Sequence, residues 1–343
     1  MDIVEQFIQK RSCSRTDFVR LLEQANCETA VNRLRAEAVR LRRYYYGNKV
    51  YTRGLIEFTN YCKNNCLYCG IRRENRFVDR FRLTQEEILQ CCENGYALGF
   101  RTFVLQGGED PYDTDDRLTQ IVRAIRSRYP DCAITLSVGE RSRDSYAQLR
   151  EAGADRYLLR HETANEAHYR HLHPQEMSLR ARKQCLYDLK ALGYQVGAGF
   201  MVGSPGQTLE TLADDLLFLQ EFQPHMVGIG PFIPHHATPF ADEPAGSVEM
   251  TLFLLSVVRI LLPRVLLPAT TALGTLDPNG RERGVLSGAN VVMPNLSPVK
   301  NRGQYELYDH KKSSGEEAEY LERLAARMQA IGYGLAVDRG DAC

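Results

Sequence analysis

Residues 54–70 read GLIEFTNYCKNNCLYCG and join an apolar run to three cysteines. The run at 54–59 is typical of a short buried strand. Cys62, Cys66 and Cys69 follow at once, and no fourth cysteine lies nearby. Parallel α/β barrels carry their chemistry in the loops after the strands. The stretch therefore predicts a functional loop at the carboxyl end of a first strand.

Seven further β-rich runs follow along the chain, with amphipathic helical patterns between most of them. The eight runs read GLIEFT, RTFVLQ, AITLSV, DRYLLRHE, QVGAGFMV, HMVGIGPFI, VLLPATT and ANVVMPN. Thr84, with Glu87 three residues later, predicts a helix start with a capping box. Because parallel strands need crossover helices, eight alternations predict an α/β fold of the (β/α)8 TIM-barrel type. A doubly wound sheet is the alternative.

Three parts are predicted along the chain. Residues 1–50 have helical spacing and arginine-rich polar faces, which predicts an N-terminal helical cap. Residues 51–300 hold the strand and helix alternation of the barrel. Residues 301–343 contain one amphipathic helical pattern and are expected to form a C-terminal extension that packs on the barrel.

Composition argues against several classes of partner. Forty-three basic residues balance forty-three acidic ones, so no nucleic-acid groove is expected. The most apolar segment, 252–268, is interrupted by Arg259, Pro263 and Arg264, so no membrane span is expected. Charged residues run through the first positions, and the cysteines lack the spacing of a secreted disulfide framework. A cytoplasmic protein is expected.

The three clustered cysteines favour an iron–sulfur cluster over a zinc site. A cubane cluster can take three thiolates on three irons and keep its fourth iron open. Structural zinc normally has four protein ligands, and no nearby residue supplies the fourth. Free structural cysteines remain a weaker alternative.

The spacing C-x3-C-x2-C, with Tyr68 before the last cysteine and Gly70 after it, resembles the radical S-adenosylmethionine (SAM) superfamily. Within it, the runs IEFTNYC, CLYCGIRREN, GEDPY, GADRYLLRHETAN, MVGSPGQT, MVGIGPFIPH and LPATTALGT resemble the HydE family of [FeFe]-hydrogenase maturases. The resemblance implies a [4Fe-4S] cluster on Cys62, Cys66 and Cys69, whose open iron binds SAM. It also implies reductive cleavage of SAM to a 5′-deoxyadenosyl radical, used in H-cluster assembly on a small iron complex with cysteine, CO and cyanide.

The same resemblance implies partners and leaves alternatives. The expected partners are another maturase that supplies the iron complex, a one-electron donor and other hydrogenase maturation proteins. Methylornithine synthase is an alternative. Biotin synthase is less favoured, because strand ends that would hold its second cluster carry Gln106, Ser137 and Gly199. A nonenzymatic metal-carrier barrel is the alternative from a different class. No cysteine triplet follows the eighth run, so one cluster is expected.

A SAM-binding set is implied at the strand ends. Glu109 resembles the residue that binds the methionine amino group of SAM. Glu162 resembles the residue that accepts hydrogen bonds from SAM. Arg182 resembles the arginine that pairs with the SAM carboxylate, with Arg180 as the alternative. The full set is Tyr68, Gln106, Gly107, Gly108, Glu109, Ser137, Arg160, Glu162, Arg182, Met226, Leu307 and Tyr308.

Strand periodicity adds an argument that does not depend on the resemblance. Residues two apart on a strand face the same side, so Arg156, Arg160 and Glu162 share a face in the fourth run. Gly199 and Gly228 leave little volume on the inner faces of the next two runs. A hollow, anion-attracting interior is therefore expected, unless the glycines relieve helix crowding and the arginines pair with acids at the barrel base. The predicted cavity set is Arg156, Arg160, Gly199, Thr270, Thr271, Met293 and Tyr305.

Overall fold

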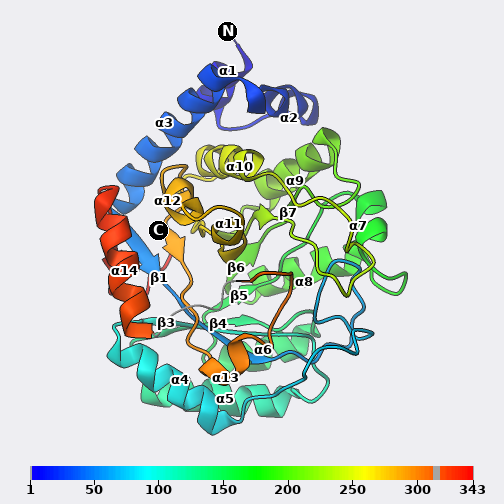
Figure 1. Ribbon diagram of the computed structural model, residues 1–343, viewed down its shortest axis with the longest axis vertical. Coiled ribbons are helices and arrows are strands. Elements are labelled where there is room, and N and C mark those ends of the chain that lie inside the picture. The colour runs from blue at the N-terminus through cyan, green and yellow to red at the C-terminus, as the bar shows by residue number, and fades with distance from the viewer. Residues whose placement is uncertain (1, 312–316, 343) are drawn as a thin grey trace.

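Parallel strand pairing builds the centre of the molecule, which the computed structural model describes for residues 2–311 and 317–342 (Figure 1). Six strands pair in chain order, each beside the one before it. They are β2 (Gly54–Thr59), β3 (Thr102–Gly107), β4 (Ala133–Ser137), β5 (Arg156–Leu158), β6 (Gln195–Ala198) and β8 (Met226–Val227). All five pairings are parallel, as the helical crossovers require.

Isolated bridges and one more strand complete the ring. Met226 of β8 bridges to Leu266, and Pro268 bridges to Val291 of β10 (Val291–Val292). Asn295 then bridges to Leu55 of β2, which returns the circuit to its start. The circuit of parallel pairings and helical crossovers confirms the predicted α/β class and the TIM-type barrel.

The strands differ from the expected runs in two places. The run VLLPATT forms isolated β-bridges but no continuous strand. Pro268 within it has no N–H to donate to a neighbouring strand, which interrupts the pairing. The fifth and sixth runs each break into two pieces. The second pieces, β7 (Met201–Val202) and β9 (Gly230–Pro231), pair with each other in a separate two-stranded sheet. Both breaks fall at a glycine position, 199 or 228.

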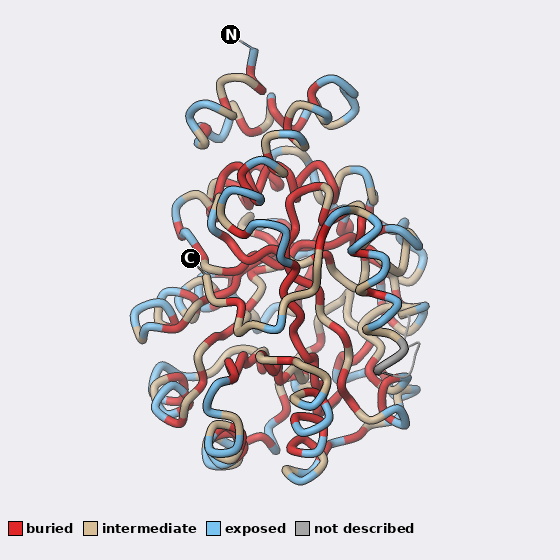
Figure 2. The backbone as a smooth tube through the Cα atoms, turned by 90° about the vertical axis from the view of Figure 1, so that its left-hand side faces the viewer, coloured by how far each residue is buried: buried red, intermediate tan, exposed pale blue. Residues whose placement is uncertain are grey.

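Helices alternate with the strands and cover the ring (Figures 1 and 2). Most begin at a Ser or Thr whose side chain accepts a backbone N–H three residues on, and the Thr84–Glu87 capping box is confirmed. They are α4 (Gln85–Ala97), α5 (Asp115–Arg128), α6 (Arg143–Glu151), α7 (Glu166–Leu172), α8 (Leu179–Ala191), α9 (Leu209–Phe222), α10 (Val248–Leu261), α11 (Thr271–Leu276), α12 (Gly280–Val285), α13 (Val299–Arg302) and α14 (Glu317–Ala330). Their buried faces and the strands form one main apolar core.

Three helices precede the ring. α1 (Ile3–Lys10), α2 (Arg15–Leu22) and α3 (Glu28–Tyr46) lie at one end of the molecule, where α3 packs on α10 and α2 on α9 (Figure 1). β1 (Lys49–Thr52) follows and spans the predicted boundary at 50 and 51. It pairs with β10 and with β11 (Gly334–Ala336), two pairings that the sequence reading missed. Residues 1, 312–316 and 343 of the predicted parts lie outside the described residues.

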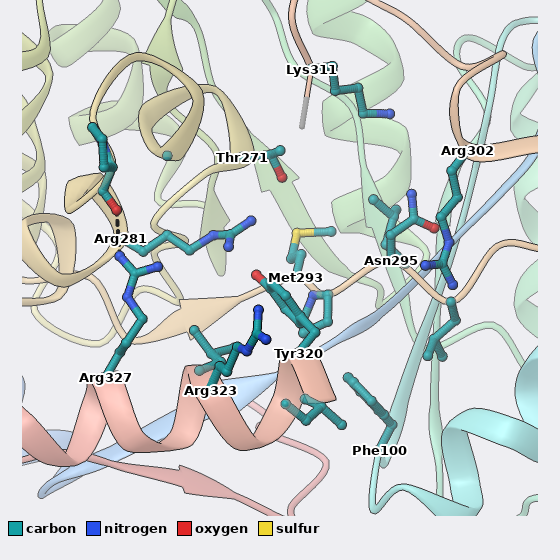
Figure 3. Close-up of a pocket in the computed structure, with 17 residues that line it drawn as sticks. Phe100, Thr271, Arg281, Met293, Asn295, Arg302, Lys311, Tyr320, Arg323 and Arg327 are labelled. Carbon is teal, nitrogen blue, oxygen red and sulfur yellow. Dashed lines mark hydrogen bonds between the residues drawn. The ribbon is translucent and has the colours of Figure 1, made fainter. Parts of the chain in front are cut away.

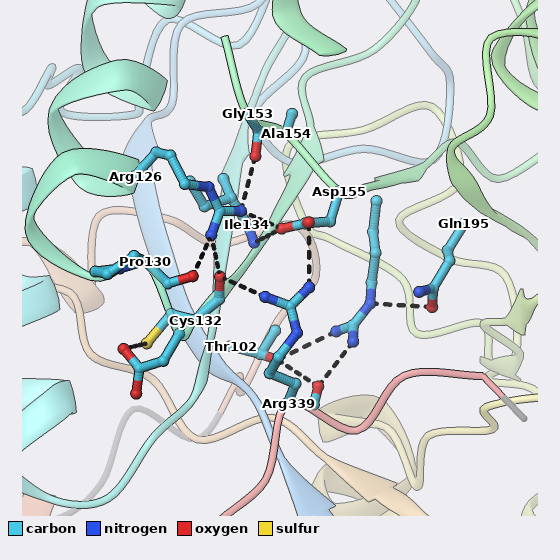
Figure 4. Close-up of polar contacts among 12 residues, drawn as sticks. Thr102, Arg126, Pro130, Cys132, Ile134, Gly153, Ala154, Asp155, Gln195 and Arg339 are labelled. Atoms are coloured by element: carbon cyan, nitrogen blue, oxygen red, sulfur yellow. Dashed lines mark hydrogen bonds and ion pairs between the residues drawn. The ribbon is translucent and has the colours of Figure 1, made fainter. Parts of the chain in front are cut away.

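The segment after β11 lies across the N-terminal ends of β3 to β6. Arg339 donates to Asp155 (Nη2 to Oδ1, 3.1 Å), which also accepts from Arg126 (Figure 4). Arg156, fully buried, donates through Nη2 to Asp341 Oδ1 (2.6 Å) and to the Arg339 carbonyl (2.7 Å). Gln195 Nε2 also donates to Asp341 Oδ1 (2.9 Å). We call residues 339–341 the floor segment, because they close the barrel end opposite the cysteine loop.

Replacing Asp341 by Asn is expected to lower stability in a pH-dependent way. Burial alone would raise the pKa of Asp341, but its ion pair and hydrogen bond with Arg156 outweigh this and hold the pKa at about 2. A depressed folded-state pKa stabilises the protein above the unfolded pKa, and that contribution is lost as the pH falls toward 2. We expect a melting temperature lower by about 2–4 °C for the variant at pH 7. That gap should shrink below about pH 4. Melting curves of both proteins across pH check this, and a gap independent of pH would contradict it.

Across the described part of the chain, no helix combines the length and the apolar character needed to cross a membrane.

Candidate active site

The loop after β2 carries the three cysteines and is folded around one arginine. The Arg80 guanidinium donates to the backbone carbonyls of Asn60, Ile71, Arg72 and Asn75. Gly70 fits tightly, because a Cβ there would lie 2.3 Å from both the Glu306 carbonyl oxygen and the His235 ring. These contacts fix the path of the loop, so the three thiols lie at defined places at the carboxyl end of β2.

Burial and mutual repulsion disfavour three free thiolates in this loop. Burial raises the pKa of all three thiols, that of Cys69 to about 12, and the charges of neighbouring cysteines further raise the pKa values of Cys66 and Cys69. A bound metal reverses this preference, since a coordinating thiol is deprotonated. Structural zinc normally takes four protein ligands, whereas a cubane cluster can take three thiolates and keep its fourth iron open.

Tyr68, between Cys66 and Cys69, is held by a buried histidine. Its hydroxyl lies 3.1 Å from His173 Nε2, and His173 Nδ1 lies 3.0 Å from the Tyr169 carbonyl oxygen. Burial lowers the pKa of His173 to about 3, so its ring is neutral. The neutral ring donates from Nδ1 and accepts the Tyr68 hydroxyl at Nε2. Sequence reasoning missed this support, which only the fold brings to the cysteine loop.

Glu109 and Arg182 meet beside the cysteine loop with a third group, Glu140. Arg182 lies 2.5 Å from Glu140 and 4.0 Å from Glu109, while Lys63 lies 3.3 Å from the other Glu109 oxygen. Burial alone would lower the pKa of Arg182, but Glu140, Tyr169 and Glu109 outweigh it and raise that pKa. Arg180 is exposed, so the geometry favours Arg182 as the predicted SAM arginine. Sequence reasoning missed Glu140, although a carboxylate just after a strand end was the available signal.

Arg160 and Glu162 form an ion pair at the end of β5 (Nη2 to Oε2, 3.0 Å). Strand alternation does not explain it, because β5 ends at Leu158 and Glu162 has a φ of 64°. Between them, His161 turns the opposite way, accepts from the Gly199 N–H and lies 3.2 Å from buried Asp215. The left-handed turn at Glu162 is therefore held by contacts on both sides.

Several buried polar atoms in this region have no well-directed hydrogen bond. They are Arg160 Nε and Nη2, Glu162 Oε2, Glu140 Oε1 and Arg182 Nε. Four of these atoms form the ion pairs Arg160–Glu162 and Arg182–Glu140. Paired cations and carboxylates beside the cysteine loop can offer matching charges to a ligand that carries both. The methionine part of SAM has an ammonium and a carboxylate, and these residues fit it.

Other predicted residues lie near this cluster. Strand register places Gln106 of β3 beside Ser137 of β4, and Gln106 Nε2 lies 3.4 Å from the Tyr305 hydroxyl. Gly107 packs against Phe58 and Thr59 of β2, and a Cβ at Gly108 would lie 2.1 Å from the Tyr61 carbonyl oxygen in the cysteine loop. Close backbone packing is therefore enough to explain why residue 108 is a glycine, and no bound ligand is needed to explain it. Burial raises the pKa of Tyr308 to about 12, and Leu307 is half-buried.

Two cavity predictions are corrected by the structure. Arg156 does not offer its charge to a ligand, because Asp341, Thr102 and the Arg339 carbonyl surround it at the floor of the barrel. This is the pairing that sequence analysis left open as the alternative. A Cβ at Gly199 would lie 2.0 Å from the Gly228 carbonyl oxygen. Gly199 therefore permits close backbone packing and provides no empty space.

Gly228 does face open space, since the nearest atom to a Cβ built there is Leu158 Cδ1 at 4.0 Å. Thr270 caps α11 by accepting the Leu273 N–H, while Thr271 and Met293 line a separate cavity (Figure 3). Met226 contacts Arg53, whose Nε and Nη2 are buried without partners. Sequence reasoning missed Arg53, because it sits in the link between β1 and β2.

A different group of possible metal ligands is linked by hydrogen bonds. Among described residues, His235, His236 and Asp309 have ligand atoms within 4.8 Å of one another. The two rings stack nearly parallel (22°), and His235 Nε2 lies 3.8 Å from Asp309 Oδ1. His235 Nδ1 accepts from the Ala237 N–H, and His236 Nδ1 lies 2.7 Å from Asp309. Hydrogen bonding accounts for this group.

Comparison with known proteins gives the family of this chain. The Radical SAM superfamily profile matches residues 56–219. The [FeFe] hydrogenase maturase subunit HydE of Thermotoga maritima is 51% identical over 271 residues, which cover 79% of this chain and 77% of that protein. The chain belongs to the HydE family of the radical SAM superfamily. Radical SAM family members use a [4Fe-4S] cluster and SAM, so the predicted enzyme class and cofactors are confirmed.

More distant relatives share the fold over nearly the whole chain. The 3-methylornithine synthase of Methanosarcina acetivorans is 28% identical over 92% of this chain and 89% of its own length. The crystal structure of methylornithine synthase (PylB) superposes with a TM-score of 0.85 at 27% identity, over 98% of this chain and 97% of that one. The HydE of Thermotoga maritima is thus markedly more similar in sequence to this chain than these methylornithine synthases are.

Proposed function

We propose that this radical SAM enzyme acts in assembly of the H-cluster of [FeFe]-hydrogenases, on a small iron complex that carries cysteine, CO and cyanide. The observation that carries the proposal is 51% identity, over most of both chains, to a protein named as an [FeFe] hydrogenase maturase subunit. The expected partners are another maturase that supplies the complex, further maturation proteins and a one-electron donor.

Each group of residues has a role in this proposal. Cys62, Cys66 and Cys69 hold the cluster, and Tyr68 is anchored by His173 so that the loop keeps its shape. The methionine part of SAM is held by Glu109, Arg160, Glu162 and Arg182. The structure adds Glu140 to this set, because it pairs with Arg182. When bound, the cluster and SAM supply one-electron cleavage of SAM to a 5′-deoxyadenosyl radical.

A chamber next to this set is the proposed place for substrate. Gly228 leaves space in the buried interior. Tyr305 contacts Gln106 of β3, and Lys311 pairs with buried Glu57 and donates to the Tyr305 carbonyl (2.7 Å). These groups can position a small polar molecule while the surrounding core excludes water.

The proposal is tested in cells that make [FeFe]-hydrogenase but lack their own HydE-type protein. Expression of this chain is expected to restore hydrogenase activity, and a Cys66→Ser variant at equal protein level is expected not to. The purified enzyme is also assayed for 3-methylornithine, the product of the alternative. Loss of maturation together with formation of 3-methylornithine would replace the proposal with that alternative.

Anaerobic reconstitution is expected to give one cubane, about four irons per chain. The cysteine loop supplies one set of three thiols, and no second triplet exists in the sequence. Iron and sulfide analysis, with a Cys62→Ser variant as the control, checks this. A reproducible count near eight would show that scattered cysteines build another cluster.

A further inference from the structure

A buried carboxyl group on α9 faces the turn that carries Glu162. Asp215 and His161 are both fully buried, and neither belongs to the residues assigned to the cluster or to SAM. Asp215 Oδ1 accepts the Ala164 N–H (2.5 Å) and lies 3.2 Å from His161 Nε2. One oxygen atom of α9 therefore contacts the chain on both sides of Glu162.

The tautomer of His161 follows from the contact of its other ring nitrogen. His161 Nδ1 accepts the Gly199 N–H (3.3 Å), so the neutral ring carries its proton on Nε2. Burial lowers the pKa of His161, which keeps the ring neutral. Nε2 therefore donates to Asp215, and the histidine links a carboxyl group on α9 to the backbone that follows β6.

The backbone of Gly199 also holds Glu162 directly. The Glu162 N–H donates to the Gly199 carbonyl (3.0 Å), while Glu162 itself has a φ of 64°. A left-handed conformation is unfavourable for a residue with a side chain, and it persists where surrounding contacts impose it. The contacts of His161 and Ala164 fix the residues before and after Glu162, so together they impose this conformation.

α8 holds the same turn through its carbonyl groups. Arg182 Nη1 donates to the Arg160 carbonyl (3.2 Å), and Lys183 Nζ donates to the Ala164 carbonyl (3.1 Å). These two donors are adjacent on α8 and bind the two ends of residues 160–164. Because Arg182 is also the predicted partner of the SAM carboxylate, the helix that binds one part of SAM also holds the turn that binds another.

The contacts of Asp215 need an acceptor oxygen more than a negative charge. Burial raises the pKa of Asp215 well above its usual range, and the charges of Asp214 and Glu162 act in the same direction. Both contacts use Oδ1, while Oδ2 forms no hydrogen bond with a described residue. The amide oxygen of an asparagine could therefore accept the same two hydrogen bonds.

We propose that Asp215 and His161 are positioning residues for SAM: they hold the turn that directs Glu162 toward it. They act through the backbone of residues 161–164. This role rests on the SAM set in the function proposed above, where Glu162 belongs to the residues that hold SAM, and it does not depend on the identity of the iron substrate.

Calorimetric titration of SAM into the anaerobically reconstituted enzyme tests this role through the dissociation constant. Asp215→Ala and His161→Phe are each expected to raise that constant roughly tenfold, the effect of losing one hydrogen bond to a charged group. The phenyl ring keeps the packing of His161 on Phe218, whose centroid lies 4.8 Å away. Asp215→Asn keeps the acceptor oxygen and should stay within about threefold of the wild type.

Two further variants separate positioning from packing and from the SAM contact itself. Leu216→Ala removes buried volume from the same helix and is the matched control. It should lower the melting temperature but leave the dissociation constant for SAM unchanged. Glu162→Gln removes the charge of the SAM contact directly and should raise the constant by roughly tenfold or more.

Melting curves identify any variant that does not fold, and His161→Phe decides the result if Asp215→Ala is one of them. If Glu162→Gln weakens SAM binding while the folded positioning variants bind as the wild type does, the positioning role alone is refuted. If Glu162→Gln also binds normally, the role of Glu162 fails and the positioning role falls with it. Equal weakening in Leu216→Ala would show a general packing effect and would also refute the positioning role. No variant is judged by hydrogenase maturation, so these results are independent of the H-cluster proposal.

Discussion

Serine at any one of Cys62, Cys66 or Cys69 is expected to reduce SAM cleavage below detection. Three irons each need one thiolate, and the structure holds all three sulfurs in one loop fixed by Arg80. A hydroxyl oxygen is a poor substitute for a thiolate on iron. The measurements are cluster absorption after anaerobic reconstitution and the yield of 5′-deoxyadenosine under reductant.

Cys185→Ser is the matched control for these variants. Cys185 lies on α8, partly buried, with its sulfur 3.9 Å from the Arg141 carbonyl oxygen and apart from the cysteine loop. Its serine variant should keep the cluster and full cleavage. Formation of 5′-deoxyadenosine by one of the three loop variants at the rate of this control would remove that cysteine from the ligand set.

The second large effect is expected from two glycines that sequence analysis treated alike. Gly199→Ala should destabilise the protein by roughly 2–5 kcal/mol, because its Cβ would overlap the Gly228 carbonyl and its φ is 153°. Gly228→Leu should leave folding, cluster content and SAM cleavage near normal, since its side chain enters open space. It should abolish maturation, because that space is the proposed substrate chamber.

Thermal melting, SAM cleavage and maturation measured on the same preparations separate the two cases. A smaller variant, Gly228→Ala, tests whether the loss scales with the volume added. Normal maturation by folded Gly228→Leu would rule out the chamber at this position. A Gly199→Ala protein as stable as the wild type would contradict the close packing of the two strands.

Most of the barrel could be predicted from the sequence because its early strands are continuous apolar runs between clear helix starts. β2, β3 and β4 coincide with their expected runs to within a residue or two. VLLPATT could not be placed as well, since an apolar run does not reveal that it makes only single bridges. The pairing of β1 with β11 joins residues nearly 300 positions apart, and no local pattern indicates it.

The site was predictable where chemistry depends on spacing, and less so where it depends on backbone shape. Three cysteines at short intervals indicate a cluster directly. Arg160 and Glu162 do lie together, but a left-handed turn brings this about, and alternation along a strand does not. Arg156 was placed on the inner face, yet its partner Asp341 comes from the far end of the chain. Long-range ion pairs of this kind have no signature in a single sequence.

The floor segment also sets an order of events during synthesis. Thr102, Arg156 and Gln195, at the starts of three strands, all bond to residues 339–341. These contacts cannot form until residues 339–341 have left the ribosome, long after the first strands have emerged. Such non-local closure slows folding and leaves strand ends exposed in the meantime. The nascent chain is therefore expected to need protection by chaperones until the floor segment has emerged and bonded to these strand ends.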